Sequence, residues 1–338
     1  MRFTITPARS ARPSAARAWA WIALVLALGA ESQKLQSAET NAPVEQLRIF
    51  FSSRVMLDLR DHDSQAAVKA WTQTVIKEAG ISAEAKSEVG DMAAIINAFR
   101  DGRADAASLP TDEYLTLIEN ARTEHLYYPI TKDDPYEEYL LLVPSEASVQ
   151  KISDLRGRRL IVLSHHRMSL ADYWLDTLLV KQALPVASTF FGNVAHKQKA
   201  ANVVLPVFFG NADACLITRR GYETMTELNP QVGKRLRVLA ASPKLVPTLF
   251  CFNARAHSKL ADRARDAIRN LHKTVFGQQI LTTFQLDGMV EGDPKFLESA
   301  RELMSDYARL CRPTPETIAA SASSRTTADD HTYAPSKP

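Results

Sequence analysis

The sequence has 338 residues, of which 46% are hydrophobic, and a formal net charge of +3 at neutral pH. This is enough chain for two domains with buried cores, which excludes a fibrous or wholly disordered protein. Residues 1–32 hold four arginines and one glutamate, so the remainder of the chain is charge-balanced. A balanced chain offers no electrostatic reason to bind nucleic acid or an anionic membrane surface.

The N-terminus has the pattern of a secretory signal. Four arginines precede an apolar run from Ala18 to Ala30, and the small residues Ala30 and Ser32 suit a signal peptidase. The alternative, an uncleaved anchor, needs about 20 apolar residues, more than this run contains. No cysteine follows the run, which argues against a lipoprotein. We therefore expect a signal peptide over 1–32, a linker over 33–46 and export to the periplasm.

Two stretches of the chain repeat the same alternation of strands and helices. In the first we expect strands at 47–53, 81–89 and 104–109, and helices at 64–79, capped by Ser64, and 92–100. In the second, which begins after 136–144, we expect strands at 158–164, 188–192 and 212–218, and helices at 169–183 and 196–209. This order predicts parallel sheets with right-handed crossovers.

A short motif marks the repeat. Gly102-Arg103-Ala104-Asp105-Ala106 returns as Gly210-Asn211-Ala212-Asp213-Ala214, each time between a helix and a strand. The glycines suit helix ends with positive φ, and the aspartates suit the turns that follow. A chance match of small residues is the alternative, but matching letters at matching places favour two similar lobes.

The C-terminal third completes the first lobe. Strands at 236–240 and 248–253 are followed by helices at 259–273, 276–284 and 294–310. We expect a two-lobed α/β protein in which a mainly parallel sheet flanked by helices forms each lobe and two strands form the hinge. Lobe 1 is 47–140 with 240–311, lobe 2 is 141–239, and 312–338 is a disordered tail. The cleft at the carboxyl ends of the strands is then the ligand site.

Three segments of the sequence carry a family resemblance: ISDLRGRRLIV (Ile152–Val162), FFGNADAC (Phe208–Cys215) and ELNPQVGKRLRVLAASP (Glu227–Pro243). With the leader, they make residues 47–310 similar to the periplasmic solute-binding proteins of phosphate, phosphite and phosphonate uptake, which have the type II periplasmic-binding fold. The resemblance implies that a small oxyanion is held between the lobes and delivered to the membrane permease of an ABC transporter. It implies no enzymatic activity and no cofactor, and we expect a monomer.

The strand-to-helix turn after 158–164 is the first candidate site. The family usually carries Ser-Thr-Ser-Gly there, and in this chain only Ser169 matches. Ser164, His165 and Arg167 add donors, and Arg167 offers a bidentate fork for an oxyanion beside a helix start. The alternative for His165 and His166 is a solvated loop. A metal site is the weakest interpretation, because adjacent side chains of an extended chain point apart.

The resemblance implies further ligand-binding residues in both lobes. They are Ser52, Ser53, Thr111 and Tyr114 in lobe 1, and Asn193, His196, Thr218 and Arg219 in lobe 2. Three of them have an ordinary alternative: Tyr114 packs its ring on the lobe, His196 lies at a polar helix start, and Arg219 is solvated.

Two other functions stay open. A hydrolase would use His165, His166 and Asp172, but no nucleophile elbow or zinc-protease motif is present. A sensor subunit would bind its ligand in the same way and dock on a membrane receptor. Of the three cysteines, Cys215 and Cys251 lie in apolar runs that favour small buried side chains, and whether any two of the three pair stays open.

Overall fold

The structure is a computed structural model that describes residues 46–56, 61–78, 80, 84–256 and 258–311. All of these belong to one compact unit, Glu45–Pro338. The expected signal peptide, all of the linker except Gln46, and the expected tail lie outside the described residues. In the part of the chain that is described, no helix is long and apolar enough to cross a membrane.

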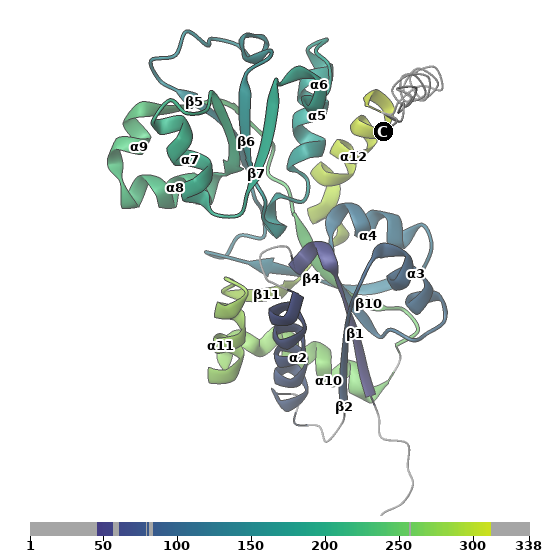
Figure 1. Cartoon of the computed structure of the whole chain (residues 1–338). Helices are drawn as coiled ribbons and strands as arrows, with labels where there is room; N and C mark the ends of the chain where they lie inside the picture. The colour runs from purple at the N-terminus through teal and green to yellow at the C-terminus, as the bar shows by residue number, and fades with distance from the viewer. Residues whose placement is uncertain (1–45, 57–60, 79, 81–83, 257, 312–338) are drawn as a thin grey trace, which may run out of the picture. The chain divides into compact units, whose positions relative to one another are not determined.

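Within the described residues, the first sheet has six strands in the order β11-β4-β10-β3-β1-β2 (Figure 1). The strands are β1 (Gln46–Ser52), β2 (Glu84–Gly90), β3 (Ala106–Pro110), β4 (Thr123–Ile130), β10 (Thr248–Asn253) and β11 (Gly288–Glu291). Strand β1 is parallel to β2 and β3, whereas β10 is antiparallel to β3 and β4, and β11 is antiparallel to β4.

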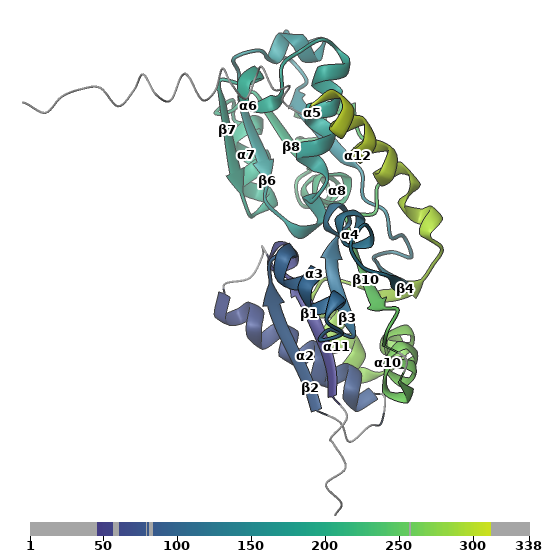
Figure 2. The same ribbon diagram turned by 90° about the vertical axis from the view of Figure 1, so that its right-hand side faces the viewer.

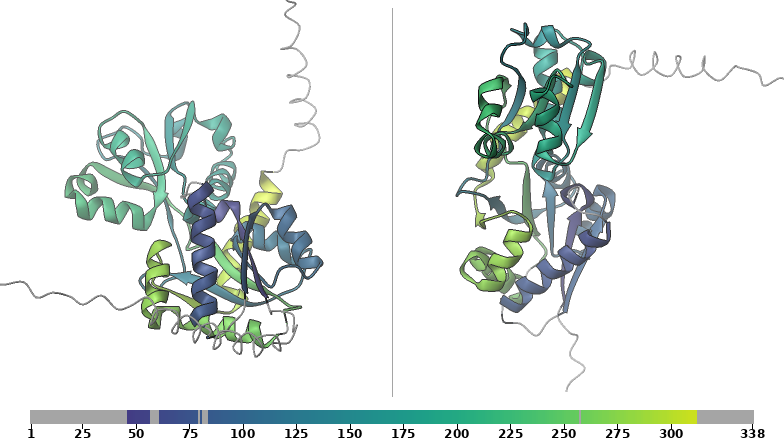
Figure 3. Two further views of the ribbon diagram at one scale, coloured as in Figure 1. Left: turned by 60° about the horizontal axis from the view of Figure 1, so that its bottom comes forward. Right: turned by 60° about the vertical axis from the view of Figure 1, so that its left-hand side comes forward.

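Neighbouring side chains of these strands enter two different cores, because successive residues of a strand point to opposite faces. Phe51 meets Trp71 of α2, with 5.7 Å between ring centroids, whereas Phe50 packs with Ile95 and Phe99 of α3. The helices around this sheet are η2 (Ser53–Met56), α2 (Asp61–Glu78), α3 (Met92–Arg100), α4 (Thr111–Ile118), α10 (Lys259–Asn270), η5 (Leu271–Lys273) and α11 (Val275–Thr283). Helix α2, purple in Figure 3, covers one face with α10 and α11, and α3 and α4 cover the other.

The second sheet has the order β7-β6-β8-β5-β9 over the residues that the structure describes. Its strands are β5 (Tyr139–Pro144), β6 (Arg159–Leu163), β7 (Asn193–Lys197), β8 (Ala214–Thr218) and β9 (Leu236–Ala241). Its helices are η3 (Ile152–Leu155), η4 (His166–Met168), α5 (Ala171–Lys181), α6 (Ala187–Phe190), α7 (Ala200–Phe208), α8 (Arg219–Leu228) and α9 (Pro230–Arg235). One hydrophobic cluster joins this sheet to its helices, and the five residues from Tyr139 to Val143 are fully buried in it.

The strand directions correct the expectation of mainly parallel sheets, since both sheets are mixed. In the second sheet β6 is parallel to β7 and β8, but β5 is antiparallel to β8 and β9. The reason lies in where β5 and β10 begin: Tyr139 starts β5 opposite Thr218, and Thr248 starts β10 opposite Pro110. Both starting points lie at the carboxyl ends of parallel strands, so β5 and β10 run the opposite way.

The region 187–199 differs from the sequence prediction. The expected strand at 188–192 is the helical turn α6, and the start of the expected helix at 196 belongs to strand β7. The carboxylate of Asp176 accepts a hydrogen bond from the Ala187 backbone N–H at 2.7 Å and so satisfies the start of α6. This contact joins residues 11 apart, which the local pattern of hydrophobic residues does not reveal. The helix predicted from Ser64 likewise begins earlier, at Asp61.

The C-terminal helix packs away from the sheet that precedes it. After β11 the chain passes through η6 (Pro294–Leu297) into α12 (Glu298–Leu310), which lies beside α5 (Figure 2). Ala300 and Leu303 of α12 belong to the hydrophobic cluster of the second sheet. The chain therefore passes between the sheets a third time, in addition to the two connections expected. Helix α12 packs in the hydrophobic cluster of the second sheet, although the sequence analysis grouped it with the first.

The repeated motif forms the same structure twice. Gly102 and Gly210 have φ of 65° and 76°, the left-handed conformation expected for them. Asp105 accepts hydrogen bonds from the backbone N–H of Arg48 at 2.8 Å and from its Nε at 3.1 Å. Asp213 does the same for Arg159, at 2.9 Å and 3.1 Å. Each aspartate thus ties the turn before a central strand to the strand beside it.

Candidate functional site

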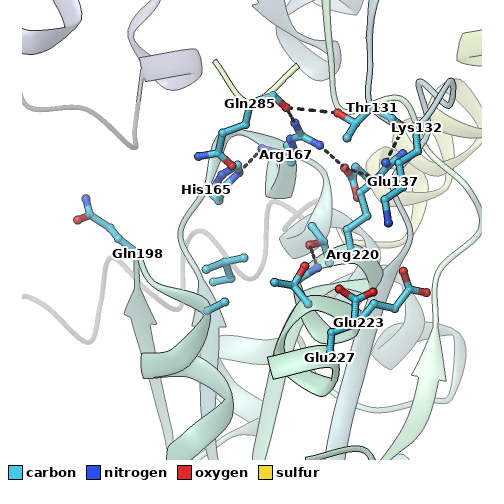
Figure 4. Close-up of a pocket in the computed structure, with 15 residues that line it drawn as sticks. Thr131, Lys132, Glu137, His165, Arg167, Gln198, Arg220, Glu223, Glu227 and Gln285 are labelled. Carbon is cyan, nitrogen blue, oxygen red and sulfur yellow. Dashed lines mark hydrogen bonds and ion pairs between the residues drawn. The ribbon is translucent and has the colours of Figure 1, made fainter. Parts of the chain in front are cut away.

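A pocket of about 420 Å³ opens where strands β6 and β8 end (Figure 4). Leu163 ends β6 and Thr218 ends β8, and both line the pocket. The other lining residues are Thr131, Lys132, Glu137, His165, Arg167, Gln198, Ala200, Arg220, Gly221, Glu223, Thr224, Glu227 and Gln285. In doubly wound sheets, ligands bind outside the carboxyl ends of the strands, where helices leave to opposite faces. This pocket has that position.

The carboxylate of Glu137 joins two arginines at the wall of the pocket. Its Oε1 accepts from Nη1 of Arg167 at 3.0 Å and lies 3.2 Å from Nε of Arg220. The Glu137 side chain is only 4% exposed, and that of Arg167 is 13% exposed. Burial raises the pKa of the Glu137 carboxyl, while the two guanidinium groups act to lower it. The three charges form a fixed, mostly desolvated network.

Other donors of the two arginines hold backbone carbonyls. Arg220 donates to the carbonyls of Thr131 at 2.6 Å and Asp134 at 3.1 Å, and Arg167 donates to the carbonyl of Gln285. The connection between β4 and β5 is therefore fastened to the start of α8. The fork of Arg167, which the sequence assigned to an oxyanion, is occupied by Glu137 and Gln285 in this structure.

Some residues of the turn between β6 and α5 line the pocket, and others contact the chain outside it. His165 and Arg167 line the pocket, and Nδ1 of His165 accepts from the Arg167 backbone N–H at 3.1 Å. Ser169 Oγ donates to the carbonyl of Pro247 at 2.7 Å and does not line the pocket. The expected helix start at Ser169 moves to Ala171, because η4 occupies His166–Met168. Ser164, just after β6, donates its backbone N–H to the carbonyl of Lys197 at 2.8 Å.

The adjacent histidines do not point apart as the extended chain predicts. The rings of His165 and His166 stack with their centroids 4.3 Å apart, because η4 turns the backbone at this point. Among the described residues, no group of three histidine, cysteine, aspartate or glutamate side chains is placed to hold a metal ion. Cys215, Cys251 and Cys311 are free thiols, and burial raises the pKa of the first two.

At the start of α8 the arginine that lines the pocket is Arg220 and not Arg219. Thr218 caps the helix by accepting the Gly221 N–H at 3.1 Å and lines the pocket. Arg219 turns to Glu138 in a bidentate pair, at 2.6 Å and 2.9 Å, outside the lining of the pocket. The pair lowers the pKa of Glu138 through the hydrogen bond from Arg219.

The four candidates of the first lobe do not line this pocket. Ser52 and Thr111 are buried, and Thr111 Oγ1 donates to the carbonyl of Val246 at 2.6 Å. Ser53 is exposed. Tyr114 lies in a hydrophobic core, with its hydroxyl 3.3 Å from that of Thr123, as in the packing alternative.

Asn193 and His196 lie on β7, the edge strand, and also stay outside the pocket lining. Asn193 pairs with Arg159 at the amino end of β6, whereas His196 pairs with Val162 near its carboxyl end. Of the twelve candidates, the structure therefore brings His165, Arg167 and Thr218 to one pocket.

Sequence reasoning missed an ionic cluster next to the turn. Arg54, two residues after the candidate Ser52, pairs with Asp112 and reaches the carbonyl of Ser169 at 3.5 Å. Tyr173 of α5 donates to Asp112 at 3.1 Å. Glu113 lies beside them, and its pKa is raised mainly by burial. The pocket residues Glu137 and Arg220 were missed as well. The only local signal for Glu137 is a charged residue shortly before the apolar run of β5.

The family model of periplasmic substrate-binding proteins of phosphonate ABC transporters matches residues 55–296. A search of curated proteins found no match.

Solved structures resemble the chain at low sequence identity. A binding component of an ABC phosphonate transporter from Pseudomonas aeruginosa aligns with a TM-score of 0.55 and 14% identity over 83% of this chain and 94% of its own. A Xanthomonas citri protein bound to ATP aligns with 0.57 and 14% over 78% and 98%. PhnD1 from Prochlorococcus marinus in complex with methylphosphonate aligns with 0.53 and 14% over 77% and 97%.

At this identity the structures establish the fold, which is the expected type II periplasmic-binding fold with two sheets flanked by helices. The family model covers well over half of the sequence and includes all the residues that line the pocket. The chain belongs to the family of periplasmic substrate-binding proteins of phosphonate ABC transporters.

Proposed function

We propose that this protein captures a small oxyanion in the pocket at the ends of β6 and β8 and delivers it to the permease of an ABC transporter. It binds its solute without turning it over. Residues 1–32 direct the chain to the periplasm, and the mature protein acts there as a monomer. Phosphate, phosphite and alkylphosphonates are the ligand class, in keeping with the family and with the methylphosphonate in the Prochlorococcus marinus relative.

The observation that carries this proposal is a ligand-sized pocket at the carboxyl ends of parallel strands, in which three basic side chains and a helix start lie beside the carboxylates of Glu137, Glu223 and Glu227. Arg167, Arg220 and Lys132 line it, and the N-terminus of α8 opens into it at Thr218. Helix N-termini and guanidinium groups both favour anions. Since Glu137 and backbone carbonyls already fix both arginines, their orientation is set before a ligand arrives, which reduces the entropy cost of binding.

Binding in such a site favours closure of the two lobes. We assign the first sheet to lobe 1 and the second to lobe 2. Gln285 and Thr131 belong to the side of the first sheet, whereas His165 and Thr218 belong to the second, and all four line the pocket. A solute that contacts lining residues of both lobes binds more tightly when the lobes are close together. It therefore stabilises the closed state by its differential affinity for that state.

Calorimetric titration of the mature protein tests the proposal. The panel is phosphate, phosphite, methylphosphonate and methanesulfonate. We expect at least one dissociation constant tighter than about 10 μM, near −7 kcal/mol. Lys132→Ala, which removes a lining cation, should weaken binding several-fold, whereas Lys151→Ala, on a residue outside the lining, should not. An absence of heat across the panel would contradict the proposed function.

A further inference from the structure

The edge of the second sheet that lies opposite the pocket has an excess of positive charge. Strands β6, β8 and β9 begin at this edge and β5 ends there, since Leu160 pairs with Ala214 and Pro144 with Leu236. The segments that meet at this edge, 145–159, 208–213 and 227–237, contain seven basic and four acidic residues. The charge balance of residues 33–338 as a whole therefore does not hold locally.

Two large apolar side chains are exposed in the same region. Phe209, which follows α7, is 64% exposed, and Leu228, which ends α8, is 77% exposed. Helices α7 and α8 pack against each other (Figure 1), and both run towards this edge, because α7 leads into β8 and α8 leads through α9 into β9. Exposed apolar groups with a polar rim are typical of an interaction surface.

The internal repeat shows that the turn after α7 does not need an aromatic side chain. Phe209 precedes Gly210, and in the other copy of the motif Asp101 precedes Gly102. Both glycines have a positive φ and form the same kind of turn. Asp101 is exposed and pairs with Arg103 at 3.2 Å, as an ordinary solvated turn residue does. The phenylalanine at 209 therefore has a role outside the turn.

Cations lie on both sides of Phe209. Its ring packs edge-on against that of Phe208, with 4.9 Å between the centroids, and the guanidinium of Arg235 lies 4.7 Å from the Phe208 centroid. Asp213, at the end of the same turn, lies 3.9 Å from Nη1 of Arg158. We define the basic edge patch as six exposed residues: Arg156, Arg158, Phe209, Leu228, Lys234 and Arg235.

The acidic residues of these segments do not cancel the patch. Asp213 is paired with Arg159 at 3.1 Å, and Asp154 accepts the backbone N–H groups of its own turn. Glu227 lines the ligand pocket. Glu146 is exposed beside the patch and remains as a single opposing charge.

We propose that the basic edge patch binds the surface of a membrane that contains anionic lipids. Lysine and arginine are attracted to anionic headgroups, while phenylalanine and leucine enter the boundary between headgroups and acyl chains. A protein partner fits less well, because the core of a protein interface is depleted of charged residues, whereas cations flank the apolar side chains here. The pocket lies at the opposite edge of the sheet, so the lipid-bound protein still captures its solute.

Sedimentation of the mature protein with lipid vesicles tests this proposal. It should bind vesicles of equal parts phosphatidylglycerol and phosphatidylcholine and not vesicles of phosphatidylcholine alone, and binding should weaken as salt screens the charges. Phe209→Asp introduces the residue of the other repeat and should lower the partition coefficient at least about fivefold. Phe276→Asp is the matched control and should change it less than about twofold, because Phe276 is 49% exposed and lies outside the patch.

A second pair of variants isolates the charge. Lys234→Glu should lower the partition coefficient roughly tenfold, since each cation near an anionic surface contributes roughly fivefold. Lys69→Glu makes the same change on an exposed residue of α2 and should have less than about a twofold effect. Solute affinity, measured by calorimetry, should stay unchanged in all four variants and confirms that each is folded.

Three results would overturn the proposal: no binding to the anionic vesicles at low salt, equal losses in patch and control variants, or a preference for an acidic polypeptide. Polyglutamate is the probe for the last case. If it binds as well as the vesicles do and Phe209→Asp affects neither, the surface is one for acidic proteins. Solute binding is a separate measurement, so the proposed function can stand or fail independently of this result.

Discussion

The hydroxyl of Tyr173 donates a hydrogen bond to the carboxylate of Asp112 at 3.1 Å. Tyr173 belongs to a helix of the second sheet and Asp112 to a helix of the first, so the bond joins the two halves of the fold. The same carboxylate holds Arg54, which also contacts the carbonyl of Ser169. Asp112 is thus a shared acceptor at the junction of the two sheets.

Replacing Tyr173 with phenylalanine should weaken this junction. The net loss from one hydrogen bond is about 0.5–1.5 kcal/mol in the free energy of unfolding, measured by urea denaturation. Tyr307→Phe is the control, because Tyr307 packs edge-on against Tyr173 at 4.8 Å without joining the bond to Asp112. Equal losses in the two variants would show that the hydrogen bond contributes nothing specific.

The variants Arg167→Ala and Arg219→Ala should lose ligand affinity to different extents, because only the first residue lines the pocket. Arg167 lines the pocket and Arg219 does not, so we expect binding to weaken by at least about tenfold in the first variant and by less than about threefold in the second. The sequence alone assigned both residues to the ligand. Comparable losses of affinity in calorimetry would mean that Arg219 also contributes to ligand binding.

Arg167→Ala should also lower the melting temperature, which an exposed turn residue would not do. Its guanidinium pairs with a carboxylate that is 4% exposed. Removing it leaves Glu137 with Arg220 alone, at a cost of about 1–3 kcal/mol. An unchanged melting curve would show that the pair with Glu137 is not formed in solution.

Replacing Glu113 or Glu138 with glutamine should change the free energy of unfolding, and the two changes should depend on pH in opposite directions. Burial raises the pKa of Glu113 above its ordinary value of 4.5, so its stabilising contribution is present below that pH and is lost as the pH rises. Glu113→Gln should therefore gain stability relative to the wild type from pH 4.5 upward.

Glu138 is the matched case with the opposite sign. The hydrogen bond from Arg219 lowers its pKa below 4.5, so its contribution is present above that pH and is lost as the pH falls. The deficit of Glu138→Gln should shrink on acidification. Urea denaturation between about pH 3 and 7 checks both variants, and parallel curves for the two would contradict the assigned directions.

The two repeated aspartates should differ in importance. Asp105 is 15% exposed and accepts three hydrogen bonds from Arg48, whereas Asp213 is 24% exposed and accepts two from Arg159. We expect Asp105→Ala to cost more, about 2–3 kcal/mol against about 1–2 kcal/mol for Asp213→Ala. Thermal unfolding of both variants provides the measurement, and a larger loss for Asp213→Ala would reverse the ranking.

The α/β class could be predicted from the order of residues alone, as could the two sheets, the internal repeat and the family. These follow from local periodicity, from helix-ending glycines such as Gly102 and Gly210, and from the fixed spacing of short segments. Local signals also located one side of the pocket, at His165, Arg167 and Thr218, because a strand end is visible in the sequence.

The pairing of charges became visible only in the folded chain. Glu137 pairs with Arg167 and Arg220, which lie 30 and 83 residues further along the chain. Arg54 pairs with Asp112, 58 residues away, and α12 packs on the second sheet instead of the first. The reason is physical: an ion pair or a packed helix depends on distances in space, and no periodicity within either segment encodes its distant partner. The same holds for the antiparallel direction of β5 and β10, which is set by the edge at which the chain joins each sheet.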